Sequence, residues 1–94
     1  MKNYETMFII NPDLDDDGIE EVIDRVTTAI EEDGGEVVEL DKWGIRELAY
    51  EIEDNSNGYY VVADFTANPA VLDELERVYR ITDQVIRYLI LKDE

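Results

Sequence analysis

Apolar and polar positions along this chain repeat with two periods, one of two residues and one of three to four. Residues 4–10 (YETMFII) alternate, which predicts a strand, and both of its faces are largely apolar, which indicates that both are covered. From about Asp15 apolar residues recur at spacings of three and four, which predicts an amphipathic helix. Gly34-Gly35 ends this helix, because glycine adopts the left-handed cap conformation. The apolar stripe consists of Ile19, Val22, Ile23, Val26 and Ile30.

The middle of the chain predicts a hairpin. Residues 36–52 form a long alternating segment that is interrupted near Trp43-Gly44, where the glycine indicates a bulge or bend. Residues 53–58 (EDNSNG) predict a turn, because Asp, Asn, Ser and Gly favour turn conformations. Residues 59–66 (YYVVADFT) are rich in β-branched and aromatic residues and predict the second strand of the hairpin.

The last part of the chain predicts a helix and a strand. Asn68 is expected as the helix N-cap, with Pro69 at the first helical position, and residues 84–91 (QVIRYLIL) predict the final strand. The order β-α-β-β-α-β predicts an α+β, ferredoxin-like single domain over residues 1–94, with a four-stranded antiparallel sheet and both helices on one face. The stripe of the second helix consists of Val71, Leu72, Leu75, Val78 and Tyr79.

The sheet face that the helices leave open is predicted to be apolar. Strand parity places on it Met7, Ile9, Tyr60, Val62, Leu89 and Leu91. A contiguous surface of this kind favours a protein partner. The alternative is that loops or edge effects cover part of it, since scattered exposed apolar residues are common.

Charge is unevenly distributed along the chain. The formal net charge is −17, yet residues 1–12 sum to zero, residues 42–50 to +1 and residues 77–92 to +3. Residues 13–41 sum to −12 and residues 51–76 to −7. Seven of the eight cations therefore lie in segments that are neutral or positive, a sorting that a purely solvating acidic coat does not require.

Catalytic and metal chemistry is poorly supported. The chain has no histidine and no cysteine, and its single serine, Ser56, lies in the predicted turn, so the usual nucleophilic triads are excluded. Asp13, Asp15, Asp17 and Gly18, with Asp24 at the twelfth position, nearly match a calcium loop, but the pattern overlaps the predicted helix and an acidic helix start is the simpler interpretation. We expect no enzyme activity, no metal site and no cofactor. The N-terminus predicts neither a signal peptide nor a membrane span, and the lack of cysteine fits a reducing cytoplasm without requiring it.

The cations and aromatic residues cluster on a few predicted elements. Lys42, Trp43, Arg46 and Tyr50 share one strand, Lys2 and Tyr4 begin another, and Arg80 and Arg87 lie near the end of the chain. Arginine can bind phosphates with its forked donors and aromatic rings can stack on bases, so this pattern favours RNA contact. The alternative is that Trp43 and Tyr50 are core residues and that the arginines pair with neighbouring acids.

These residues also carry a family resemblance. Tyr4-Glu5, Asn11-Pro12, WGIRELAY at 43–50, GYYV at 58–61 and RITDQVIRY at 80–88 resemble the bacterial small-subunit ribosomal protein six family over nearly the whole chain. The pattern W-G-x-R-x-L-A-Y is its most specific part. The resemblance implies the same ferredoxin-like fold, no catalytic activity and a place on the ribosome in the cytoplasm.

The resemblance further implies binding to the central domain of small-subunit ribosomal RNA, together with ribosomal protein eighteen of the small subunit, and no small-molecule substrate. By matching positions, rRNA contact is carried over to Lys2, Tyr4, Arg46, Arg80 and Arg87, with Lys42, Trp43 and Tyr50 in support. The surface predicted for the protein partner rests on strand parity and not on a family motif.

The chain departs from the family pattern toward acidity. Glu47 stands where a second basic residue is common, Glu51 where proline is usual, and Asp54 where lysine is common. With 25 acidic residues and a polyanion as the implied partner, we interpret the chain as adapted to high salt, and thus as halophilic.

Two other functions remain open on sequence alone. One is a ferredoxin-like regulatory or ligand-binding domain that uses the open face for a small molecule or a second copy. The other is a small acylphosphatase-like enzyme on the same fold. Such an enzyme needs a phosphate-binding loop after the first strand, where this chain has Asn11-Pro12-Asp13.

Overall fold

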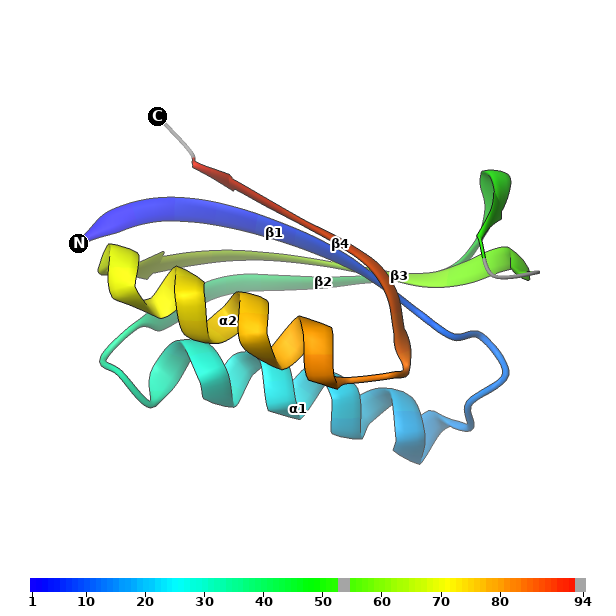
Figure 1. The fold of residues 1–94 in the computed structure, drawn as a ribbon, viewed down its shortest axis with the longest axis horizontal. Helices are drawn as coiled ribbons and strands as arrows, with labels where there is room; N and C mark the ends of the chain where they lie inside the picture. Colours follow the sequence, from blue (N-terminus) through cyan, green and yellow to red (C-terminus); the bar gives the residue numbers. More distant parts are fainter. Residues whose placement is uncertain (53–54, 93–94) are drawn as a thin grey trace.

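A four-stranded antiparallel sheet lies against two helices that cover one of its faces (Figure 1). The computed structural model describes the backbone of residues 1–52 and 55–92 and the side chains of residues 1–48 and 57–92. The strands have the order β2-β3-β1-β4, and the β-α-β-β-α-β arrangement confirms the predicted fold. The elements are β1 (Lys2–Ile10), α1 (Asp16–Glu31), β2 (Glu36–Ile52), β3 (Asn55–Ala67), α2 (Pro69–Ile81) and β4 (Val85–Lys92).

The helices begin and end close to the predicted residues. Asp15 is the N-cap of α1, and its Oδ1 accepts a 2.8 Å hydrogen bond from the amide of Gly18. The helix is closed by the amide of Gly35, which donates to the Ile30 carbonyl at 3.1 Å, while Gly34 adopts φ +89°. Asn68 holds the N-cap position of α2, but its side chain makes no capping hydrogen bond. Among the described residues, no helix combines the length and apolarity needed to span a membrane.

The β2–β3 hairpin is longer than predicted. β3 begins at Asn55, so the prediction of a turn over 53–58 was wrong for its last four residues, and residues 53–54 lie outside the described part of the chain. Ladder pairing with β2 overrides the turn preference of these polar residues, as the pairs Glu47–Asn57 and Arg46–Gly58 demonstrate. The bulge is confirmed: the register shifts between Lys42 and Gly44, and Gly44 has φ +80°.

The core lies between the sheet and the helices. It contains Phe8 and Ile10 of β1, Val61 and Phe65 of β3, and the predicted stripe of α1, all nearly inaccessible to solvent. One buried polar side chain joins three elements, because the Thr6 hydroxyl donates to the Leu89 carbonyl at 2.9 Å and lies 2.7 Å from the Tyr79 hydroxyl. Thr6 has one proton to donate, so Tyr79 is the donor of the second hydrogen bond.

Candidate nucleic-acid and protein interface

The sheet face opposite the helices, here called the open face, is organised in rows that cross the strands. Directly paired residues of neighbouring strands point to the same side, so the register places side chains on this face. One row runs from Glu39 through Asp64 and Glu5 to Leu91, and the next from Asp41 through Val62 and Met7 to Leu89. A third row runs from Gly44 through Tyr60 and Ile9 to Arg87, and Arg46 follows opposite Gly58.

The last two rows form an aromatic end, defined here as Trp43, Arg46, Tyr60 and Arg87. The Trp43 ring stacks on Tyr60 with the centroids 6.3 Å apart and the planes inclined by 9°. The bulge at Lys42–Gly44 places both Trp43 and Gly44 opposite Tyr60, and it brings Arg46 to the same face as Trp43. Trp43 is 48% exposed, and both arginines are exposed. Flat rings beside guanidinium groups can stack on bases and bind phosphates.

The other end of the open face carries carboxylates. The carboxylate end is defined as Glu5, Glu39, Asp41 and Asp64, which belong to two adjacent rows. Beside it, toward β4, runs an apolar strip made of Met7, Val62, Leu89 and Leu91. Leu89 is 45% exposed and Leu91 48%, so the β4 side of the apolar strip is open to solvent, whereas Met7 and Val62 are half-buried.

Ile9, which was predicted to face a protein partner, lies on the open face but is only 4% exposed. A Cβ at Gly58 would stand 2.2 Å from Ile9 Cγ2 and 3.5 Å from a methyl group of Leu48. Ile9 and the buried Leu48 therefore pack together over Gly58, under the base of the extended hairpin. The partner prediction for Ile9 is corrected, because this packing hides the side chain.

Two residues predicted to contact RNA do not reach the open face. Lys42 lies on the helix side, where its Nζ donates a hydrogen bond to Glu20 of α1, and this bond raises the pKa of Lys42. Tyr4 is 4% exposed and stacks on Phe65 with the ring centroids 5.5 Å apart. The buried ring of Tyr4 has no surface left for stacking on a base, so we leave Tyr4 out of the proposed contacts.

The remaining predicted contacts lie around the edge of the domain. A hydrogen bond to Tyr88 raises the pKa of Arg80, at the end of α2, and a carboxylate oxygen of Glu76 at 3.4 Å raises this pKa further. Lys2 begins β1, and the β1–β4 register brings it next to Lys92, whose pKa is lowered by this neighbouring charge. Lys92 was not among the predicted contacts, because only the strand pairing reveals the two-lysine corner. The side chain of Tyr50 lies outside the described residues.

The near match to a calcium loop is folded into α1. The helix begins at Asp16, Asp15 is its N-cap, and Asp24 is an exposed residue within the helix. The twelve-residue loop would therefore have to unwind more than two turns of α1. Within the residues that the structure describes, no group of three acidic side chains is arranged to hold a metal ion.

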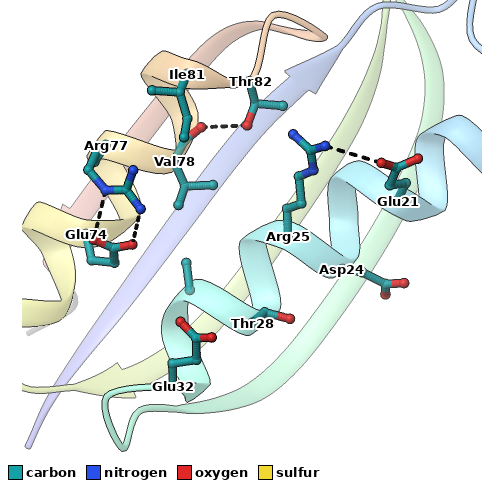
Figure 2. A pocket seen from close by; sticks show the side chains of 11 residues that line it. Glu21, Asp24, Arg25, Thr28, Glu32, Glu74, Arg77, Val78, Ile81 and Thr82 are labelled. Carbon is teal, nitrogen blue, oxygen red and sulfur yellow. Dashed lines mark hydrogen bonds and ion pairs between the residues drawn. The ribbon is translucent and has the colours of Figure 1, made fainter.

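A groove of about 450 Å³ lies between α1 and α2, on the side away from the sheet (Figure 2). Two arginines line it, and each already meets a carboxylate of its own helix. Arg25 donates to Glu21 at 3.3 Å, and Arg77 donates to both oxygens of Glu74 at 3.0 and 2.6 Å. Both cations of the groove are therefore paired with carboxylates of the helices that carry them.

Comparison with known proteins identifies relatives over the whole chain. The family model described as "Ribosomal protein S6" matches residues 3–92. The "Small ribosomal subunit protein bS6" of Caldanaerobacter subterraneus is 49% identical over 94 residues, covering 100% of this chain and 99% of that protein. The protein of the same name from Clostridium novyi is 47% identical with the same coverage. The crystal structure of the 30S ribosomal protein S6 from Thermotoga maritima superposes with a TM-score of 0.93 at 35% identity, covering 98% of this chain and 87% of that one.

Proposed function

This chain belongs to the ribosomal protein S6 family, and from that premise we propose that it binds the central domain of small-subunit ribosomal RNA together with ribosomal protein eighteen. It is a non-enzymatic constituent of the small ribosomal subunit, and its place is therefore the ribosome in the cytoplasm. A regulatory or ligand-binding domain and an acylphosphatase-like enzyme, which the sequence alone left open, are set aside by this membership.

The aromatic end of the open face carries the RNA part of the proposal. A half-exposed indole that is already stacked on Tyr60 is a rigid platform, so a base that stacks on it loses little protein conformational freedom. Stacking of this kind contributes about 1–3 kcal/mol per base. Arg46 and Arg87 share the face with the platform and can hold the phosphates of the same strand.

We propose that Arg80 and the corner formed by Lys2 and Lys92 also contact RNA. Lys2 and Arg80 retain the assignment that the family resemblance implies, and Lys92 joins Lys2 because the two ammonium groups share a corner of the sheet. Lys42 takes part less directly, since its charge is engaged by Glu20 on the helix side. The proposed contact for Tyr50 rests on the family motif alone.

The protein partner is proposed to cover the apolar strip. Its four residues lie on the open face beside the aromatic end, so RNA and protein would meet side by side on one surface. Tyr60 belongs to both surfaces, because its ring supports Trp43 and its neighbour along the face is Val62. Ile9 supports the surface from below and does not form part of it.

The acidic surface is proposed to be an adaptation to high salt. At about 1 M salt the screening length is roughly 3 Å, so repulsion between a −17 protein and RNA fades while contacts at hydrogen-bond distance persist. The few cations then suffice, provided that they touch phosphates directly.

The experiment is a binding titration of a central-domain rRNA fragment in the presence of ribosomal protein eighteen at molar salt. Arg46→Gln should weaken the complex roughly tenfold or more, the effect of losing a charge-assisted contact. Arg25→Gln is the matched control, because it removes the same charge from α1, on the opposite side of the sheet. Equal affinity of the Arg46→Gln variant and the unaltered protein would contradict the proposal.

A further inference from the structure

We propose that the carboxylate end and the apolar strip together dock a basic segment of the protein partner, and that they exclude the RNA from this half of the open face. This inference rests on the proposed function, since it concerns how the same face is divided between RNA and protein. The occupant is a protein segment that carries lysine or arginine together with apolar side chains.

The first observation is the alignment of like charges. Asp64 stands directly opposite Glu39 on one side and Glu5 on the other, so three carboxylates lie in one row across β2, β3 and β1. Asp41 adds a fourth in the next row. Like charges directly opposite each other destabilise a sheet, so the free protein bears a cost that a bound cation would remove.

The second observation is that the four carboxylates of this end take part in no ion pair among the described side chains. The ion pairs among the described side chains join Arg25 to Glu21, Lys42 to Glu20, Arg77 to Glu74 and Arg80 to Glu76, and none of them involves the carboxylate end. The four carboxylates also do not converge on a point that would suit a metal ion, a statement limited to the described residues. A row spread across three strands fits an extended or helical segment that crosses them.

The third observation is the neighbouring apolar strip. Leu91 continues the carboxylate row onto β4, and Leu89 continues the row of Asp41. A partner that buries the half-exposed leucines must therefore pass over or beside the carboxylates. Phosphates would be repelled there, whereas basic side chains would be attracted, so the charge selects protein over RNA at this end.

The test uses the full chain and purified ribosomal protein eighteen without RNA. Glu5→Gln/Asp64→Asn should bind the partner roughly tenfold more weakly at low salt, with a shallower salt dependence. The same variant should unfold at a higher urea concentration than the unaltered protein, because the repulsion across the row is gone. Opposite changes in binding and stability distinguish a docking role from a structural one.

Glu31→Gln/Asp73→Asn is the matched control, since it removes two charges from the helices and should leave partner binding unchanged. Equal partner binding by the unaltered protein and Glu5→Gln/Asp64→Asn would overturn this inference alone. Weaker binding of RNA by that variant in the absence of the partner would also overturn it, because the row would then contact RNA. Failure of the unaltered protein to bind the partner would overturn the proposed function, and this inference with it.

Discussion

The indole of Trp43 lies almost parallel to the ring of Tyr60, with 9° between their planes and 6.3 Å between their centroids. The pair joins the two strands of the hairpin at the bulge of β2, so its orientation depends on the backbone there. Because Trp43 remains 48% exposed, the stack buries one face of the indole and leaves surface for a ligand. A core tryptophan, the alternative left open by the sequence, would have been covered.

Trp43→Leu should weaken binding of the central-domain rRNA fragment by roughly 5- to 150-fold, the loss of one stacking contact of about 1–3 kcal/mol. Trp43→Phe should retain most of the affinity, because it keeps an aromatic face. Both variants should fold, since the side chain lies largely at the surface. A filter-binding or fluorescence titration at fixed salt measures this, and full affinity in Trp43→Leu would exclude the indole from the interface.

The positive φ of Gly44 gives a second prediction. Gly44→Ala and Gly34→Ala each place a Cβ in open space at φ +80° and +89°, so both changes carry only the backbone penalty of roughly 1–2 kcal/mol. Urea unfolding should detect a similar loss in both. Only Gly44→Ala should also shift the tryptophan emission and weaken RNA binding, because it alters the bulge that aims Trp43. Identical emission spectra for the two variants would show that the backbone conformation at Gly44 does not determine the orientation of the indole.

The packing of Ile9 over Gly58 predicts a compensating pair. Gly58→Ala places a methyl group 2.2 Å from Ile9 Cγ2, so we expect a loss of about 1–3 kcal/mol in the free energy of unfolding. Ile9→Ala removes the clashing methyl group but leaves a cavity of its own. In a double-mutant cycle the combined variant should be more stable than the sum of the two losses predicts. If the two losses in free energy of unfolding simply add, the backbone at position 58 moves away from Ile9 and the predicted clash does not form.

Burial of Tyr79 predicts loss of stability in alkali. Desolvation raises the pKa of Tyr79 above its ordinary value of 10.0 because the phenol lies in the core. The contribution of Tyr79 to the free energy of unfolding is therefore fully present below about pH 10. It is lost as the pH rises above this value, because the phenol is ionised at a lower pH in the unfolded chain than in the folded protein. The slope reaches at most about 1.4 kcal/mol per pH unit. Urea unfolding from pH 9 to 11 should give a flatter profile for Tyr79→Phe, and an equally steep profile would contradict this assignment.

The element order was predictable because periods of two and of three to four residues are local properties of the chain. The bulge at Gly44 was predictable for the same reason. The effect of the bulge on the faces of β2 was not, because a shift of one residue places Lys42 and Arg46, which have the same parity, on opposite sides of the sheet. The burial of Tyr4 was predictable from the sequence, because Tyr4 has the same strand parity as the core residue Phe8.

Contacts between strands that are distant in sequence were beyond prediction. Lys92 meets Lys2, and Ile9 is covered by Leu48, only because the register between their strands takes these values. The cover over Ile9 also required the hairpin to continue through residues whose composition favours a turn. The carboxylate row has the same origin, since Glu5, Glu39 and Asp64 are remote in sequence and meet only in the sheet.

The charge of −17 predicts that salt stabilises this fold. Self-repulsion acts over roughly 30 Å at 0.01 M salt and about 3 Å at 1 M, so molar salt removes most of it. If this repulsion amounts to about 1–2 kcal/mol, the melting temperature should rise by roughly 5–15 °C between these concentrations of potassium chloride. A melting temperature that stays flat or falls would refute the proposed adaptation.

A variant at the C-terminal end of α1 tests whether the acidic residues there account for part of the stabilisation by salt. Glu31 and Glu32 lie where the helix dipole disfavours acids, Asp33 follows them, and the last turn has no basic residue. Glu31→Gln/Glu32→Gln/Asp33→Asn should therefore melt higher than the unaltered protein at low salt and gain less from added salt, so that the two curves converge near 1 M. Parallel curves would show that salt acts through the hydrophobic core, because a general effect on burial would not depend on these three charges.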